Sequence, residues 1–185
     1  RQNKVRSRKM WQGCYDSGWQ GEITAASFSH PAKFSRGLIQ RIYTHAFEQG
    51  LLAPGMIVVD PFGGVALGAL DAMWNGLNWI GMELEPKFVT LGQQNIALWQ
   101  RKYGSKDGFG SARIVQGDSR KLSQVISSVD LVCSSPPFLD PNAGKRNNVA
   151  EMAAGKIPKI GLLNANEYAD MSPGQLGSMK EGDFD

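Results

Sequence analysis

One stretch of the sequence decides the fold: Met56-Ile57-Val58-Val59-Asp60-Pro61-Phe62-Gly63-Gly64. Its apolar run predicts a buried strand, and an acid followed by glycines is typical of a parallel sheet that presents backbone at a strand end. A second stretch has the same build, an apolar run over 129–133 followed by Ser134-Ser135-Pro136-Pro137-Phe138. Its two prolines fix the backbone, and its aromatic ring offers a flat face to a planar ligand. The two stretches predict two ligand-binding loops on one sheet.

The segments around these stretches alternate between strand and helix patterns. A helix that Ser35 caps and that ends at Gly50 comes first, and Pro86 occupies the first turn of a later, long helix. The predicted strands are 56–60, 78–84, 112–118 and 129–134, and the helices after the first are 66–75, 86–103 and 122–126. This alternation predicts a parallel sheet with right-handed crossovers.

The two stretches resemble motifs of S-adenosylmethionine-dependent DNA amino-methyltransferases, which modify exocyclic nitrogens of adenine or cytosine. In that family a loop similar to Asp-Pro-Phe-x-Gly-x-Gly occurs together with a motif of the form Asp/Asn/Ser-Pro-Pro-Tyr/Phe. The segment His30-Pro31-Ala32-Lys33-Phe34 resembles the one that lies over the cofactor's methionine part. The resemblance covers residues from about 29 to 138. It implies a Rossmann-like class I methyltransferase fold, α/β, with a mostly parallel sheet flanked by helices and incomplete at the C-terminus.

Cofactor binding in the resembling family maps onto strand ends of this chain. Ligands of such sheets sit beyond the carboxyl ends of the strands, where the strand order reverses. Glu83 follows Asp60 by 23 residues, a position where an acid can accept hydrogen bonds from ribose hydroxyls. The implied cofactor-binding residues are His30, Lys33, Asp60, Pro61, Phe62, Gly63, Gly64, Glu83, Asp118 and Ser119. Asp118 has an alternative reading as the cap of the next helix. The sequence departs from the family's loop at Ala66, where glycine is usual.

The catalytic residues implied by the resemblance are Ser135, Pro136, Pro137 and Phe138. The target base leaves the duplex stack, Phe138 stacks on it, and the Ser135 hydroxyl and Pro136 carbonyl accept hydrogen bonds from its amine. Catalysis by positioning then needs no protein nucleophile. The serine form of the motif slightly favours cytosine N4 over adenine N6. A nicotinamide-binding domain would share the glycine loop, but it would not need Ser-Pro-Pro-Phe.

Two alternatives to a DNA methyltransferase stay open. The first is an amino-methyltransferase that acts on RNA or on a protein glutamine, whose family form usually has Asn where Ser135 stands. The second is a non-catalytic module of the same fold that binds the cofactor or nucleic acid, which Ala66 and the expected missing strands make conceivable.

Charge is distributed unevenly and points to a polyanionic partner. The first ten residues carry five basic side chains and no acidic one, whereas the other 175 carry 15 basic and 17 acidic residues. A basic arm over residues 1–28 suits DNA, because phosphate neutralisation releases counterions. A solvated tail is the alternative. A restriction-modification or phage setting, and hence a cytoplasmic location in a prokaryotic or phage-infected cell, is expected.

Composition excludes several other classes. The chain of 185 residues is 42% hydrophobic, which suits one core, and it has no apolar run of the ~20 residues that span a bilayer. Cys14 and Cys133 are its only cysteines, so we expect no structural metal and two inert thiols. Between 139 and 185 the sequence reads as a flexible loop region that leads toward missing strands or a recognition region. We therefore expect a truncated chain. The oligomeric state is not indicated.

For several other side chains the sequence predicts a position in the core or at the surface. Four aromatic residues are predicted to lie in the core, namely Trp74, Trp79, Phe88 and Trp99. Trp11, Tyr15 and Trp19 either grip DNA beside the basic arm or pack against the body. Glu85 is predicted to be a solvated surface residue, and His45 is predicted to be structural.

Overall fold

A computed structural model of the chain describes residues 11–30 and 33–135. Its elements, in chain order, are η1 (Ala25–Ser29), α1 (Arg36–Glu48), β1 (Ile57–Asp60), α2 (Leu67–Trp74), β2 (Asn78–Glu83), α3 (Pro86–Tyr103), β3 (Ser111–Gln116), η2 (Ser119–Gln124) and β4 (Leu131–Val132). The predicted alternation of strands and helices is confirmed. Two details differ: β4 is only two residues long, and the last predicted helix is a 3₁₀ helix that begins three residues earlier than expected.

The four described strands form one parallel sheet in the order β3-β2-β1-β4. The chain moves outward from β1 through β2 to β3 and then returns to the other side of β1, where β4 pairs with it. The strand order therefore reverses between β1 and β4. This is the topology of a Rossmann-like sheet, whose ligands bind at such a reversal. The fold predicted from the alternation is confirmed.

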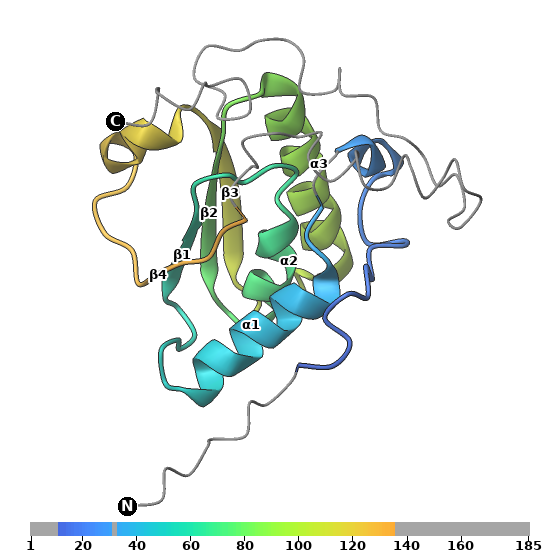
Figure 1. Ribbon diagram of the computed structural model, residues 1–185, viewed down its shortest axis with the longest axis vertical. Helices are drawn as coiled ribbons and strands as arrows, with labels where there is room; N and C mark the ends of the chain where they lie inside the picture. Colours follow the sequence, from blue (N-terminus) through green and yellow to red (C-terminus); the bar gives the residue numbers. More distant parts are fainter. Residues whose placement is uncertain (1–10, 31–32, 136–185) are drawn as a thin grey trace, which may run out of the picture.

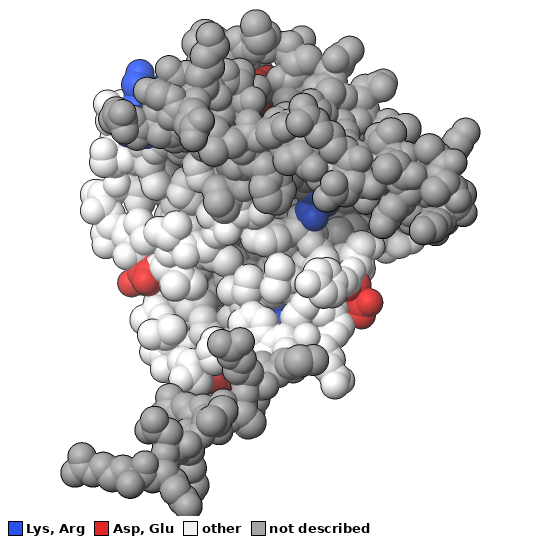
Figure 2. All heavy atoms as spheres, viewed as in Figure 1, with Lys and Arg blue, Asp and Glu red and all other residues white. Residues whose placement is uncertain are grey.

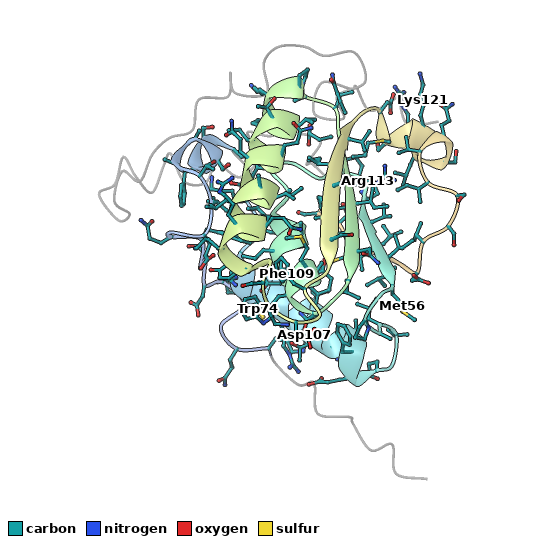
Figure 3. All side chains as sticks on the ribbon, turned by 180° about the vertical axis from the view of Figure 1, so that it is seen from behind. Met56, Trp74, Asp107, Phe109, Arg113 and Lys121 are labelled. Carbon is teal, nitrogen blue, oxygen red and sulfur yellow. The ribbon has the colours of Figure 1, made fainter. Side chains whose placement is uncertain are left out.

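One face of the sheet carries the main core. The register aligns Val58, Trp79, Ala112 and Leu131 in a row across the sheet, and all four belong to or pack against the core cluster. Helices α1, α2 and α3 gather on this face, whereas η2 lies on the other side (Figure 1). Seen from behind, Arg113 of β3 and Lys121 of η2 lie on the side away from α3 (Figure 3).

Helix α2 lies against the sheet and between two other helices. Seven of the eight residues of α2 are buried, because this short helix is covered by the sheet and by its two neighbouring helices. Trp79 and Trp99 are fully buried and Phe88 nearly so, as predicted. Trp74 departs from the prediction, since it is 43% exposed at the last turn of α2, where it stacks edge-on against Tyr103.

The N-terminal segment, defined here as the described residues between 11 and 35, packs against α3. Trp19 is 1% exposed and donates from its indole Nε1 to the Phe34 carbonyl at 2.5 Å, so of its two alternatives packing holds. Further along, the Trp99 indole donates to the Glu22 carbonyl at 2.5 Å, and the Tyr103 hydroxyl donates to the Glu22 carboxylate. Ser35 caps α1 as predicted, with its hydroxyl accepting from the Leu38 amide.

Glu85 departs from its predicted position. The Glu85 side chain is buried, so the prediction of a solvated surface position is wrong. It stands at the N-cap of α3, where the turn between β2 and that helix packs inward.

Within the described part of the chain, no helix combines the length and the apolar composition that crossing a membrane requires.

Candidate functional site

The two motifs meet through a hydrogen bond between adjacent strands. Ser134, just after β4, donates from its hydroxyl to Asp60 Oδ1 at 2.6 Å. The Cys133 amide donates to the Val59 carbonyl at 2.9 Å, which continues the pairing of the two strands up to this point. The same Asp60 oxygen accepts from the Phe62 amide at 2.9 Å. Two stretches that are 74 residues apart in sequence therefore join at the reversal of the strand order.

Burial changes the protonation of two groups at this junction. The Asp60 carboxyl is only 4% exposed, and desolvation raises its pKa to about 6 even though the hydrogen bonds from Ser134 and Phe62 lower it. Desolvation also raises the pKa of the Cys133 thiol to about 11, and the nearby Asp60 charge adds to this effect. A thiol with such a pKa stays protonated at neutral pH and is a poor nucleophile. The prediction of an inert Cys133 agrees with this environment.

The glycine loop after β1 needs its glycines for two separate reasons. The Gly63 amide donates to the Met82 carbonyl at 2.7 Å, and a Cβ at Gly63 would lie 3.2 Å from the Gly81 Cα. Gly64 has a φ of +53°, and a Cβ there would lie 3.1 Å from His30 Nε2. Side chains are therefore disfavoured at both positions, and the loop presents bare backbone.

Ala66, where the resembling family has glycine, adopts the left-handed conformation that glycine favours. Its φ is 66° and its ψ is 29°, at the N-cap of α2, and among the described residues it is the one non-glycine residue with positive φ. Left-handed backbone costs an L-residue roughly 1–2 kcal/mol. The chain thus keeps the backbone shape of a glycine loop although the methyl group is present.

Glu83 stands at the end of β2 and holds the glycine loop from the side. Its Oε2 accepts from the Gly64 amide and its Oε1 from the Glu85 amide, each at 2.9 Å. Burial raises its pKa, and backbone hydrogen bonds from Glu85, Gly64 and Leu84 oppose this. A carboxylate has about four acceptor positions, so the bonds from the Gly64 and Glu85 amides leave acceptor capacity for a ligand hydroxyl.

Asp118, after β3, has the capping role that was its alternative reading. Its carboxylate accepts from the Arg120 amide at 3.0 Å and forms a bidentate pair with the Arg120 guanidinium, whose closest contact is 2.6 Å. These contacts lower the pKa of Asp118 to about 2. Ser119 is the first residue of η2. A ligand amine would have to share this carboxylate with Arg120.

His30 and Lys33 come from the N-terminal segment and approach the same loop. The His30 ring is buried, contacts the Phe88 ring edge-to-face at 4.3 Å, and stands over Gly64. The Lys33 ammonium donates to the carbonyls of His30 at 2.5 Å and Phe28 at 3.0 Å, so it fastens this segment upon itself. The structure therefore brings His30 to the glycine loop, while these two hydrogen bonds of Lys33 go to backbone of its own segment.

Ser135 is exposed, directly after the Ser134 side chain that is bonded to Asp60. The remaining predicted catalytic residues, Pro136, Pro137 and Phe138, lie outside the described residues, as do Pro31 and Ala32 of the His-Pro segment. Pro61 and Phe62 follow β1, and both are partly exposed beside Asp60. Across residues 11–30 and 33–135, no three His, Cys, Asp or Glu side chains gather where they could hold a metal ion.

Sequence reasoning missed two polar residues that organise this region. Ser134 is part of the second quoted stretch, but the sequence assigns it no role of its own. Asn95 carries no prediction, although it is fully buried on α3 and bonds to Val65 of the glycine loop. Helical spacing could have identified Asn95, because it is a polar residue on the helix face that also carries the buried Phe88, Gly92 and Trp99.

Comparison with known proteins gives no sequence relative. No protein-family model matches the sequence, and no curated protein matches it either. Solved structures with a similar arrangement include a protein-L-isoaspartate O-methyltransferase, the precorrin 8W decarboxylase from Methanobacterium thermoautotrophicum, and the delta-N METTL16 MTase domain.

These three structures are distant from the chain. Their sequence identities are 16%, 14% and 15%, and their TM-scores are 0.42, 0.46 and 0.45, in that order. The matches cover 59%, 75% and 67% of this chain, which spans 32%, 65% and 60% of the length of those proteins. Such values assign neither a substrate nor an activity.

Proposed function

We propose that the chain is an S-adenosylmethionine-dependent methyltransferase that acts on the exocyclic amino group of a DNA base, with cytosine N4 favoured over adenine N6. One observation carries the proposal: the 2.6 Å hydrogen bond between Ser134 and Asp60 joins the Asp-Pro-Phe-Gly-Gly stretch to the Ser-Ser-Pro-Pro-Phe stretch at the reversal of the strand order. Ligands of Rossmann-like sheets bind at this point. Methyl transfer requires the nucleoside cofactor and the planar target amine to bind side by side, and these two adjacent loops would place them so.

The residues at the strand ends fit a nucleoside cofactor. Gly63 and Gly64 allow close approach to backbone that side chains would obstruct, and Glu83 keeps an acceptor position for a ribose hydroxyl. His30 would close the loop from above Gly64. S-adenosylmethionine supplies, when it is bound, an electrophilic methyl group. The residues proposed to hold it are therefore His30, the glycine loop, Glu83 and, in competition with Arg120, Asp118.

The target amine would meet residues that follow β4. Because Ser134 is bonded to Asp60, the backbone from which Ser135 projects is held at the end of β1. We propose that the Ser135 hydroxyl and the Pro136 carbonyl accept hydrogen bonds from the amine and orient its lone pair, while Phe138 stacks on the base. Orientation of this kind can supply several kcal/mol of rate acceleration. Cys133 takes no part, because its pKa of about 11 leaves the thiol protonated.

DNA as the partner rests on the sequence of the basic arm. Its five basic residues lie within 1–10, outside the described residues. On the face shown in Figure 2, the lysines and arginines of the described residues are scattered and form no continuous patch. A basic arm would contribute phosphate contacts, whose affinity falls steeply with salt.

The proposal is tested by transfer of radiolabelled methyl from S-adenosylmethionine to unmethylated double-stranded DNA, followed by nucleoside digestion and mass spectrometry. The variant Ser135→Ala, Phe138→Ala serves as the negative control. Ser128→Ala, an exposed serine ahead of β4, serves as the matched control that keeps activity. We expect label in 4-methylcytidine or 6-methyladenine with the wild type and with Ser128→Ala. Cofactor binding without label in DNA, but with label in RNA or protein, would contradict the DNA assignment.

A further inference from the structure

Asn95 bonds two separate segments of the chain from the interior of α3. Its side-chain Nδ2 donates to the Val65 carbonyl of the glycine loop and to the Ser27 hydroxyl of η1, each at 2.9 Å. Its Oδ1 accepts from the Thr24 amide, also at 2.9 Å. Both donors and the acceptor of the amide are therefore satisfied, although the side chain is completely buried.

Packing alone does not require an amide side chain at position 95. A buried amide is costly unless all its hydrogen bonds are made, and an apolar side chain would fill the same space without that requirement. The neighbouring buried positions on α3 differ: Gly92 has no side chain, and the Trp99 indole donates to the Glu22 carbonyl rather than to the glycine loop. What Asn95 adds to packing is a fixed link between η1 and the loop.

The two linked segments meet at Gly64, which belongs to the proposed cofactor site. Val65 directly follows Gly64, and η1 ends one residue before His30, whose ring stands over Gly64. A shift of either segment relative to the other would change the space between His30 and the loop. Ser27 is itself fully buried and bonds to Thr24 Oγ1 at 2.8 Å, which makes the link to η1 rigid.

We propose that Asn95 is a positioning residue that holds the glycine loop and the His30 segment in fixed relation, so that cofactor affinity depends on it. The identity of the cofactor in this inference rests on the proposed function. The link between the two segments does not, because it can be measured on the chain without any ligand.

The decisive comparison is between Asn95→Asp and Trp99→Phe. Asn95→Asp keeps the shape of the side chain and places a carboxylate oxygen against the Val65 carbonyl, so the bond to the glycine loop is lost, and Ser27 can then bond this side chain only as a donor. Trp99→Phe removes the bond from the same helix to the Glu22 carbonyl, one turn further along, and leaves the glycine loop untouched. Trp99→Phe therefore controls for loosening of the N-terminal segment and for loss of stability. Ser27→Ala, a milder change, provides a second test if Asn95→Asp does not fold.

Hydrogen–deuterium exchange on the unliganded chain measures the link directly. We expect Asn95→Asp to speed exchange in peptides that cover both 24–30 and 61–67, and Trp99→Phe to speed it only near 19–24. Faster exchange in 24–30 alone would show that the two segments are not coupled through Asn95 and would overturn the inference. Ser27→Ala is expected to speed exchange in 24–30 and, to a smaller extent, in 61–67.

Calorimetric titration with S-adenosylmethionine measures the consequence. Loss of the buried bond to Val65, with two acceptors left facing each other, is expected to raise Kd about tenfold or more in Asn95→Asp, whereas Kd rises about threefold in Ser27→Ala and changes by less than about twofold in Trp99→Phe. Equal Kd values for Asn95→Asp and Trp99→Phe would overturn the inference. Failure of the wild type to bind S-adenosylmethionine would overturn the proposed function instead, and the exchange experiment would still decide whether the link exists.

Discussion

Asp60 has a buried carboxyl group whose protonation changes with pH. Burial raises its pKa from 3.8 to about 6. An acid with a higher pKa in the folded chain binds its proton more tightly when folded, so the free energy of unfolding falls as pH rises from about 4 to about 6. We expect Asp60 to contribute about 3 kcal/mol to this loss in the wild type, and Asp60→Asn to remove that contribution, as measured by urea denaturation across this pH range.

The comparison between variants isolates Asp60 from other groups that titrate. Glu83 shifts in the same direction, so the wild type alone would show a larger slope than Asp60 causes. The difference in free energy between the wild type and Asp60→Asn removes this contribution, and Asp107→Asn, an exposed aspartate, controls for the loss of one carboxylate. A difference that stays constant from pH 4 to pH 7 would contradict the assignment.

Ser134 acts on the same carboxylate, with an effect that depends on charge. Above pH 7 its hydroxyl donates to an ionised, buried acceptor, and such hydrogen bonds are worth more than neutral ones. Ser134→Ala is expected to lower the free energy of unfolding by about 2 kcal/mol at pH 8 and by clearly less at pH 4, where Asp60 is protonated. Denaturation of Ser134→Ala beside Ser128→Ala at both pH values measures this, and an equal loss at both would count against the bond.

At the scale of elements, the start of α2 is set by backbone conformation. Ala66 is completely buried with positive φ, and a Cβ at Gly92 of α3 would lie 3.4 Å from its methyl group. Ala66→Val adds a β-branched side chain in left-handed backbone and in a filled space, so we expect a loss of about 3 kcal/mol. Ala66→Gly relieves the backbone but loses a buried methyl group and is expected to stay within about 1 kcal/mol.

Thermal or urea denaturation of the two Ala66 variants tests this account of the loop. The two changes share one position, so each serves as the other's control. A tolerated Ala66→Val would mean that the loop can leave the left-handed conformation, and the glycine-loop geometry described above would then not be fixed by the fold.

Elements with strong local signals could be predicted from the sequence, whereas several contacts could not. Helix α3 begins and ends at the predicted residues, because Pro86 occupies its first turn and its apolar residues recur at helical spacing. Glu85 and Trp74 were misjudged because their burial depends on how a turn and a helix end pack against other elements. Asp60 and Ser134 were each placed at a strand end, but their bond requires β4 to lie beside β1, which local sequence does not encode.

At the scale of the whole molecule, the described part of the N-terminal segment belongs to the same core as the sheet. Trp19 and Ile23 are buried in the cluster that also holds Trp79 and Trp99, and the segment carries His30 to the glycine loop. The proposed cofactor site thus combines the N-terminal segment, which carries His30, with the loops that follow the strands of the sheet.

This arrangement predicts unequal roles for two tryptophans of that segment. Trp19 is 1% exposed, so Trp19→Ala is expected to lower the free energy of unfolding by about 3–5 kcal/mol in a single cooperative transition. Trp11 is 37% exposed and contacts Arg41 and His45, so Trp11→Ala is expected to cost less than about 1 kcal/mol. Urea denaturation followed by circular dichroism measures both. If Trp19→Ala cost no more than Trp11→Ala, the segment would not belong to the cooperative core, and His30 would have no fixed place over the glycine loop.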